Sequence, residues 1–461
     1  MKKTELPLHK NDEFDLEITA VSSDGVGIGR HLGVAVFVPH TAVGDTVRCH
    51  IIKVTSSYAV AKCLQLLSPS PQRIADDCAV GHTCGGCVYR HVTYAAELEY
   101  KRQRITDAFA RIGGVSLALP AVTPSPLVEG YRNKAILPIA RAADGSLAVG
   151  YYAPRSHRVC DAVDCRLMPQ EMRIAAALTK QFLVQHNLSI YDEKSGNGLV
   201  RALYLRRAHF SGQMLYCLIV NGKTLPHAQQ LIDTVRKELP CVTGILLCVN
   251  QKQTNVMLTD RFLTLWGQSE LQETLCGKQF TVSPLSFWQV NSPQTEQLYA
   301  KAAEFAALTG RETVLDLYCG TGSVGLSMAE GAEKLIGAEI VDAAVQNARH
   351  NAAQNGVTNA EFLCADAAKA AALLAQRGLQ PDVVLLDPPR AGCDSHLIHT
   401  VCQQMRPARV VYISCDPATL ARDCGVFALL GYRLTDAAAF DLFPRTSHVE
   451  TVVCLKQHIQ Q

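Results

Sequence analysis

The chain has 461 residues, of which 48% are apolar and 19% are charged, with a formal net charge of +2. This length allows two to four domains with their own cores, and the near-neutral charge excludes a nucleic-acid-binding protein that is basic throughout. The longest apolar stretches, such as TGILLCVN and PDVVLLDPP, are too short to cross a bilayer. The 18 cysteines, with no positively charged and apolar leader before them, indicate a cytoplasmic protein that does not bind membranes.

Residues 1–70 carry short runs in which apolar and polar residues alternate, among them FDLEITAV, VAVFVP and TVRCHIIKV. This pattern predicts a small, five-stranded, OB-like β-barrel. Barrels of this type commonly hold oligonucleotides, so the pattern supports RNA binding and a purely structural module equally. The SPSPQR stretch that begins at Ser68 is predicted to be a linker.

A cysteine-rich stretch, CAVGHTCGGCVYRH, follows the linker. It contains Cys78, Cys84 and Cys87, and a second pair, Cys160 and Cys165, lies far downstream. Thiolates at this spacing bind a metal ion or an iron-sulfur cluster, and the spacing alone does not separate iron-sulfur from zinc. The two glycines between the second and third cysteines are expected to form the tight turn that two ligands need. The alternative is a set of reduced cysteines that are close in sequence only.

Two stretches of the central region interleave cations with aromatic residues: YKRQR, which begins at Tyr100, and RALYLRRAHF, which begins at Arg201. Such runs suit RNA phosphates and unstacked bases. They are more often a solvated face, so this pattern alone is a weak indication of an RNA-binding surface.

The C-terminal portion begins with ETVLDLYCGTGSVGLSMA, which predicts a strand that ends at Asp316, a turn containing Gly320 and Gly322, and a helix. This is the opening βα unit of a nucleotide-type fold. The turn lacks the G-x-G-x-x-G spacing of dinucleotide-binding proteins, and it fits a ligand built from methionine and adenosine better.

Acidic residues end the strands that follow. Glu339 ends the next strand, where a carboxylate can accept hydrogen bonds from both ribose hydroxyls, and Asp366 and Asp387 end later ones. The regular βα alternation predicts a Rossmann-like α/β domain with its ligand at the carboxyl ends of the strands. Arg390 follows two prolines where methyltransferases acting on amines usually carry an aromatic residue, which indicates a different target atom.

Two residues near the C-terminus are candidates for catalysis. Cys415 lies just after the apolar run VVYIS, at the end of a predicted strand, where open α/β sheets carry their chemistry. Glu450, in HVETVVCL, is either a catalytic base or a surface carboxylate at the start of a strand.

The motifs FWQVN, DLYCGTG, DPPRAG, SCDPATLARD and HVETV occur in the order seen in RNA uridine C5 methyltransferases. Over essentially the whole chain the sequence resembles the 23S ribosomal RNA (uracil-5-)-methyltransferases of that family. The resemblance implies a TRAM barrel over residues 1–70, a central α/β domain with an iron-sulfur cluster over 71–285, and a class I methyltransferase domain over 286–461. It also implies methyl transfer from S-adenosylmethionine to C5 of a uridine in 23S rRNA.

The resemblance carries roles onto individual residues. It implies that the Cys415 thiolate adds to C6 of uracil and that Glu450 removes the C5 proton afterwards. It implies a 4Fe-4S cluster on Cys78, Cys84, Cys87 and Cys165, with Cys160 left out. It implies cofactor contacts from Gln289, Tyr318, Glu339, Asp366 and Asp387, while Gln289 and Asp387 are also candidates to hold the uracil edge. Ser323 departs from the Asn that some members carry, which puts that one contact in question.

Two other functions remain open. A tRNA T-loop uridine methyltransferase shares the catalytic motifs, but that branch generally lacks the four-cysteine site and the barrel, so these features favour ribosomal RNA. A non-catalytic iron-sulfur protein that binds RNA is the other alternative, and the intact Cys415, Glu450 and Asp387 argue against it. The protein is expected to act on RNA as a monomer.

Overall fold

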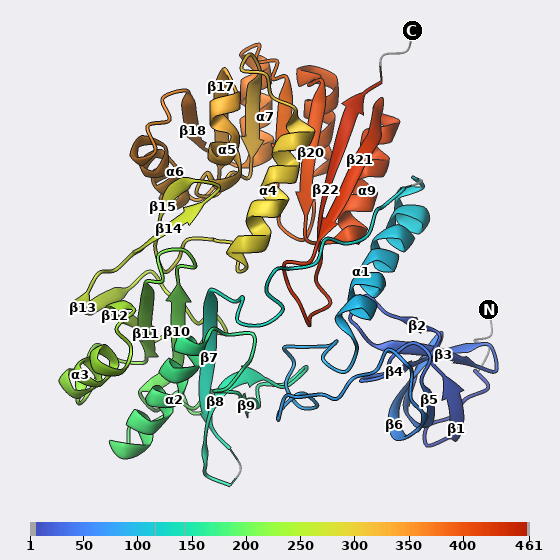
Figure 1. Cartoon of the computed structure of the whole chain (residues 1–461), viewed down its shortest axis with the longest axis vertical. Coiled ribbons are helices and arrows are strands. Elements are labelled where there is room, and N and C mark those ends of the chain that lie inside the picture. The colour runs from blue at the N-terminus through green and yellow to red at the C-terminus, as the bar shows by residue number, and fades with distance from the viewer. Residues whose placement is uncertain (1–5, 116, 143, 459–461) are drawn as a thin grey trace.

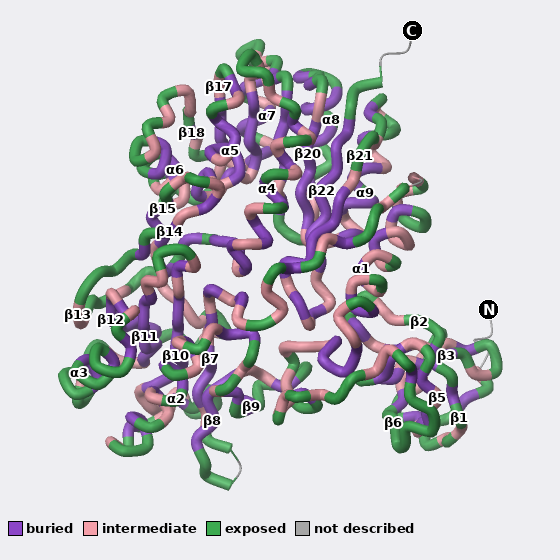
Figure 2. The backbone as a smooth tube through the Cα atoms, viewed as in Figure 1, coloured by how far each residue is buried: buried purple, intermediate pink, exposed green. Residues whose placement is uncertain are grey.

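The computed structural model describes residues 6–115, 117–142 and 144–458. Three β-sheet units follow one another along the chain: an N-terminal barrel, a central sheet and a C-terminal α/β sheet (Figure 1). Buried residues concentrate along the strands of all three units, while loops and outer helix faces are exposed (Figure 2). In the described ranges, no helix is both long and apolar enough to cross a membrane.

The N-terminal barrel is built from a single sheet with the strand order β1-β5-β6-β4-β3-β2. Its strands are β1 (Glu13–Glu17), β2 (Ala20–Val21), β3 (Gly27–His31), β4 (Val34–Val38), β5 (Thr46–Val54) and β6 (Tyr58–Ser68). Alternate residues of β4 point into the core, where Val36 packs with Leu16 and Ile51. The sheet has six strands rather than the predicted five, because the two residues of β2 form a short extra strand against β3.

The segment after the barrel was predicted to be a linker, but it is fastened to the barrel. Asp45 is fully buried, and its carboxylate accepts hydrogen bonds from the backbone N–H of Ser70 (2.9 Å) and from Arg73 Nη2 (2.7 Å). Because a buried carboxylate needs such partners, this contact fixes where the chain leaves the barrel.

The central sheet has the order β13-β12-β11-β10-β7-β8-β9, and only the pair β11 and β12 is parallel. Its elements are β7 (Lys134–Arg141), β8 (Leu147–Tyr152), β9 (Val159–Asp161), α2 (Gln170–Gln185), β10 (Val200–Arg207), β11 (Met214–Val220), α3 (Ala228–Glu238), β12 (Val242–Val249) and β13 (Phe262–Gly267). Helices α2 and α3 contribute apolar residues to one core with these strands.

Two of the three arginines of β10 do not contribute to the RNA-binding surface that the sequence suggested. Arg201 and Arg206 in β10 are buried. The Arg201 guanidinium donates to the backbone carbonyls of Asn250 and Lys252, at 2.9 and 2.8 Å. Arg206 donates in the same way to Ser283, at 2.8 Å. Both side chains therefore satisfy loop carbonyls inside the protein, and neither presents its charge to a phosphate.

The C-terminal sheet has the order β18-β17-β16-β19-β20-β22-β21. Its elements are α4 (Ser292–Ala306), β16 (Thr313–Leu317), α5 (Ser323–Met328), a 3-10 turn (Ala329–Gly331), β17 (Lys334–Glu339), α6 (Asp342–Gln354), β18 (Ala360–Cys364), α7 (Ala367–Gln376), β19 (Val383–Leu386), α8 (Ser395–His399), a π-helical turn (Thr400–Met405), β20 (Arg409–Ser414), α9 (Pro417–Leu429), β21 (Tyr432–Phe440) and β22 (Glu450–Gln457). The first five strands of the sheet order are parallel, and β22 runs antiparallel to both β20 and β21. A hairpin of β14 (Leu271–Leu275) and β15 (Lys278–Val282) precedes this unit.

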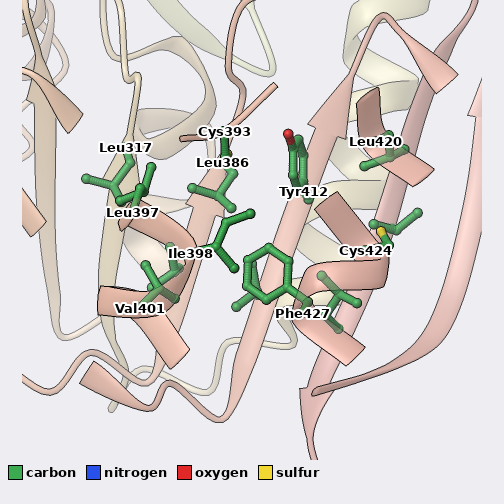
Figure 3. Close-up of a cluster of buried hydrophobic side chains, with 14 of the residues drawn as sticks. Leu317, Leu386, Cys393, Leu397, Ile398, Val401, Tyr412, Leu420, Cys424 and Phe427 are labelled. Atoms are coloured by element: carbon green, nitrogen blue, oxygen red, sulfur yellow. The ribbon is translucent and has the colours of Figure 1, made fainter. Parts of the chain in front are cut away.

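One face of the C-terminal sheet is sealed by a cluster of apolar side chains (Figure 3). Leu317 and Leu386 come from neighbouring parallel strands, and Leu397, Val401 and Phe427 come from the helices that cover them. All are nearly or fully buried. This packing fixes the positions at which the parallel strands end.

A buried ion network ties the first helix to the C-terminal unit. Helix α1 (Tyr94–Ala108), which continues as a π-helical turn (Phe109–Gly113), packs beside α9. Lys101 lies in α1, and its Nζ is 2.7 Å from Glu97 Oε1 and 2.7 Å from Asp441 Oδ1, with all three side chains fully buried. Lys101, from the YKRQR stretch, is thus a structural cation. Through Asp441, Lys101 anchors residues 441–449, the stretch that leads into β22. We call this stretch the 441–449 segment.

Replacing Lys101 with Met is expected to lower the free energy of unfolding by about 3 to 5 kcal/mol, because it removes the ammonium that pairs with both buried carboxylates and leaves only Arg445, at 3.6 Å from Glu97. The control is Arg102→Met on the same helix, whose partner Glu99 is largely exposed. That change is expected to cost less than about 1 kcal/mol. Urea unfolding followed by circular dichroism measures both, and equal losses would contradict this account of the network.

Candidate active site

A cavity of about 680 Å³ opens at the carboxyl ends of β16, β17, β19 and β20. The residues predicted from sequence to bind the cofactor or to act in catalysis all line it: Gln289, Tyr318, Glu339, Asp366, Asp387, Cys415 and Glu450. The structure thus brings together side chains that are spread over more than a third of the sequence.

Cys415 and Glu450 lie side by side because of the strand register. Cys415 directly follows β20, and Glu450 is the first residue of β22. Ser414 pairs with Thr451 in the antiparallel ladder, so the next position on each strand places Cys415 opposite Glu450. Glu450 is 3% exposed, so it is not the surface carboxylate that the sequence left open.

The Gly-rich turn after β16 shapes one side of the cavity. Tyr318, Gly320 and Gly322 all have positive φ angles, of 68°, 54° and 82°. This is a conformation that tyrosine rarely adopts, and it bends the backbone sharply away from the strand. The backbone N–H of Gly320 then donates to Glu339 Oε2 at 3.2 Å, while Val341 donates to Oε1 at 2.8 Å. These two bonds fix the orientation of the Glu339 carboxylate in the cavity wall.

Two further wall residues are held by local hydrogen bonds. Asp366 is the N-cap of α7, and its Oδ1 accepts from the backbone N–H groups of Ala368 and Lys369. Ser323 Oγ lies 3.1 Å from the Tyr299 hydroxyl. Ser323, which departs from the family pattern, therefore still presents a polar group to the cavity.

Burial and repulsion between negative charges raise the pKa values of the groups around Cys415. Burial and the nearby Asp387 raise the pKa of Glu450 to about 8, and burial raises that of Asp387 to about 7. Burial and the charges of Glu450 and Asp387 raise the pKa of the Cys415 thiol to about 11, while the positive charge of Arg390 acts in the opposite direction. The cavity therefore resists forming several negative charges at once.

Several residues of the cavity wall have no role predicted from the sequence. Arg390 was noted only as the residue after two prolines, yet its Nη2 lies 3.2 Å from Nε2 of His448, another wall residue. His448 is two positions before Glu450, and this period-2 spacing in an extended segment could have indicated that the two share a face. Phe287 also lines the cavity with 66% of its surface exposed, and its place at the start of the FWQVN motif could have indicated this.

A second cavity, of about 220 Å³, is lined by the four predicted cluster cysteines: Cys78, Cys84, Cys87 and Cys165. Cys160 does not line it, and its Sγ instead donates to the carbonyl of Thr83 at 3.1 Å. Arg90 and Arg132 also line this cavity. Burial raises the pKa of Cys87, and the positive charges of these two arginines partly offset that increase. Within residues 6–115, 117–142 and 144–458, no group of three or more His, Cys, Asp or Glu side chains converges tightly enough to hold one metal ion.

The chain bends at the two glycines of the cysteine loop, as predicted, but without the positive φ angles that favour glycine. Neither Gly85 nor Gly86 has a positive φ. Gly85 also packs closely, because a Cβ there would lie 3.1 Å from the carbonyl oxygen of Tyr152, closer than most Cβ contacts. The backbone N–H of Val88, just after the third cysteine, donates to the carbonyl of Arg445 at 2.8 Å, which joins this loop to the 441–449 segment.

Residues 93–458 match the family described as tRNA (uracil-5-)-methyltransferase, and residues 7–64 match the TRAM domain. Among similar proteins are RNA methyltransferases named as uncharacterized from Clostridium tetani and Halalkalibacterium halodurans. The first is 38% identical over 98% of both chains and the second is 38% identical over 99% of both.

Among solved structures, the chain resembles the crystal structure of Pyrococcus abyssi tRNA (uracil-54, C5)-methyltransferase in complex with S-adenosyl-L-homocysteine. The match has a TM-score of 0.76 at 28% identity and covers 96% of this chain and 100% of that one. Together with the family match over most of its length, this shows that the chain belongs to the (uracil-5-)-methyltransferase family and is an S-adenosylmethionine-dependent RNA methyltransferase with an N-terminal TRAM domain.

Proposed function

We propose that this enzyme methylates C5 of a uridine in RNA through a transient covalent bond between Cys415 Sγ and C6 of the uracil. The observation that carries the proposal is the placement of Cys415 opposite Glu450, with Asp387 nearby, at one end of the cavity. A nucleophile and a base must reach neighbouring atoms of one ring, and strand pairing puts these two side chains next to each other.

The chemistry requires both groups because C5 of uracil is a poor nucleophile. The Cys415 thiolate forms a bond to C6, and the electrons of the C5–C6 double bond move onto the ring as an enolate. C5 then takes the methyl group from the sulfonium, which leaves as the neutral thioether. Glu450 removes the C5 proton, the double bond reforms, and the Cys415 thiolate is expelled. The net products are the methylated uridine, S-adenosylhomocysteine and one proton.

The remaining predicted residues are assigned to ligand binding. Glu339, with its carboxylate oriented by Gly320 and Val341, is placed to accept hydrogen bonds from the ribose hydroxyls of the cofactor. Tyr318 and Asp366 line the same wall, while Gln289 and Asp387 lie where they can hold the uracil edge or the cofactor. The acidic wall also suits a ligand that carries a sulfonium and an ammonium charge.

Two RNA classes are candidate substrates. The sequence motifs over the whole chain resemble the 23S ribosomal RNA branch, and we propose 23S rRNA as the substrate on that basis. The similarity to a tRNA enzyme over 96% of the chain supports tRNA instead, and it removes the argument that the barrel alone distinguishes the branches. Mapping 5-methyluridine in both RNAs after incubation with the pure enzyme, or in a strain that lacks it, decides between them.

We also propose that Cys78, Cys84, Cys87 and Cys165 hold a 4Fe-4S cluster. A single zinc ion, at about 2.3 Å from each sulfur, needs four thiols that meet at one point. The four thiols here surround a space of about 220 Å³ instead, which suits a polynuclear cluster better. With four cysteine ligands the cluster has no open position, so its contribution is to structure or electron transfer.

The proposal extends to the organisation of the chain. We divide it into a barrel over residues 1–70, a central domain over 71–285 and a catalytic domain over 286–461. The residues assigned to catalysis, cofactor binding and the cluster line cavities formed within one chain, so a monomer suffices for the proposed activity, and a monomer is the form that we propose.

The two catalytic variants are expected to fail at different steps. Cys415→Ala leaves nothing to add to C6, so neither methylation nor an RNA adduct should form. Glu450→Gln should still add and transfer the methyl group but then stall, because the C5 proton stays in place. With labelled cofactor and substrate RNA, a denaturing gel should show a methylated protein–RNA conjugate for Glu450→Gln only. A conjugate from Cys415→Ala would assign the nucleophile to another cysteine.

The single-turnover rate of methylation is expected to rise with pH between about 6 and 9. A raised pKa of about 8 keeps the Glu450 carboxyl protonated at neutral pH, and a protonated carboxyl cannot accept the C5 proton. Raising the pH ionises both Glu450 and Cys415, so both steps should accelerate. Rapid-quench measurements at saturating cofactor test this, and a rate that falls over this range would contradict the assignment of Glu450 as the base.

Anaerobically purified protein is expected to be brown and to contain about four irons per chain. Cys165→Ser should lose the iron, whereas Cys160→Ser should keep it, because Cys160 lies outside the cluster cavity. Iron analysis and the visible absorption spectrum measure both variants. Zinc in place of iron, or iron lost from Cys160→Ser alone, would refute this ligand set.

A further inference from the structure

Formation of the Cys415 thiolate meets an electrostatic obstacle in this cavity. The thiol is partly buried, and the carboxyl groups of Glu450 and Asp387 face it from β22 and from the loop after β19. Each disfavours a negative sulfur, since like charges at close range in a poorly solvated site repel. Arg390 lines the same cavity as Cys415, and its positive charge favours the thiolate.

Arg390 has a long and flexible side chain at an exposed position, so its guanidinium must be held if it is to act on Cys415. Its Nη2 donates to Nε2 of His448 at 3.2 Å, across 58 residues of sequence. We propose that His448 is a positioning residue that holds the Arg390 guanidinium against Cys415, so that Arg390 stabilises the thiolate that adds to RNA. This inference rests on the proposed role of Cys415 as the nucleophile.

The choice of a neutral partner for Arg390 has a physical reason. Burial and the positive charges of Arg390, Arg104, Lys101 and Arg132 lower the pKa of His448 to about 4. The imidazole is therefore neutral at physiological pH, and its Nε2 can accept a hydrogen bond. A carboxylate in its place would orient Arg390 equally well but would cancel the charge. A neutral acceptor leaves the full positive charge available to the sulfur.

His448 is itself held firmly by the 441–449 segment. Its backbone N–H donates to Thr446 Oγ1 at 3.3 Å, and its ring packs edge-on against Phe443 with 5.7 Å between the centroids. Arg104 donates to the carbonyl of the preceding residue, Ser447, at 2.6 Å. The imidazole is thus a fixed acceptor on a fixed segment, as positioning of a mobile arginine requires.

The test measures how fast iodoacetamide alkylates Cys415 in the RNA-free enzyme, because only the thiolate reacts. Digestion and mass spectrometry quantify the modified Cys415 peptide separately from those of the other cysteines. His448→Phe keeps the aromatic packing but removes the acceptor. It is expected to slow alkylation at pH 8 about tenfold, which corresponds to one pKa unit. His448→Gln restores an acceptor and is expected to stay within about threefold of the unmodified enzyme.

A control variant and the outcomes complete the design. His157→Gln changes an exposed histidine outside the cavity and should leave the alkylation rate unchanged. Equal alkylation of Cys415 in His448→Phe and the unmodified enzyme would overturn the inference, even if methylation falls. Equal slowing in His448→Phe and His448→Gln would also overturn it, because the acceptor would then not matter. A conjugate formed by Cys415→Ala would instead refute the proposed nucleophile, so the two failures are distinguishable.

Discussion

The antiparallel pairing of β22 between β20 and β21 determines how this active site is assembled. The parallel strands of an α/β sheet bring only their carboxyl ends to the ligand edge. By running the other way, β22 brings its amino end to that edge, and with it Glu450. Glu450 and Cys415, which are 35 positions apart in the chain and are the proposed base and nucleophile, therefore meet through one step of strand register. A slip of one residue in this ladder would turn Glu450 to the opposite face of the sheet.

Several acidic side chains lie at the same edge of the sheet, and burial raises the pKa values of three of them: Asp316, Asp387 and Glu450. Asp316 lies beneath the Gly-rich turn, where its carboxylate accepts from Gly325 and burial, with Asp387 nearby, raises its pKa to about 8. Burial raises the pKa values of Asp387 and Glu450 in the same way, to about 7 and about 8, so these two carboxyls hold their protons at higher pH than exposed acids do. A cationic ligand in this cavity would favour the ionised acids. In the proposed mechanism, binding of the sulfonium would therefore favour the ionised form of Glu450, the form that can accept a proton.

Much of the catalytic unit could be predicted because its signals are local. Glu339, Asp387 and Cys415 each mark the end of an apolar run, and parallel strands in a βα series must end at a common edge. The role of the cationic stretches could not be predicted in this way. Arg206 and Lys101 look like surface charges in sequence, but their partners lie in segments far along the chain. The pairing of Arg390 with His448 likewise depends on tertiary structure, because neither residue belongs to a pattern that includes the other.

The buried network of Glu97, Lys101 and Asp441 joins the first helix to a segment near the C-terminus, so the residues of the two segments are expected to change together in evolution. Lys101 and Asp441 are 340 residues apart, yet neither tolerates replacement alone, because the partner would remain as an uncompensated charge in the interior. Substitutions at these positions should therefore appear together among relatives rather than one at a time. Hybrids that join the first helix of one family member to the catalytic domain of another will fold well only when both parents carry matching residues here.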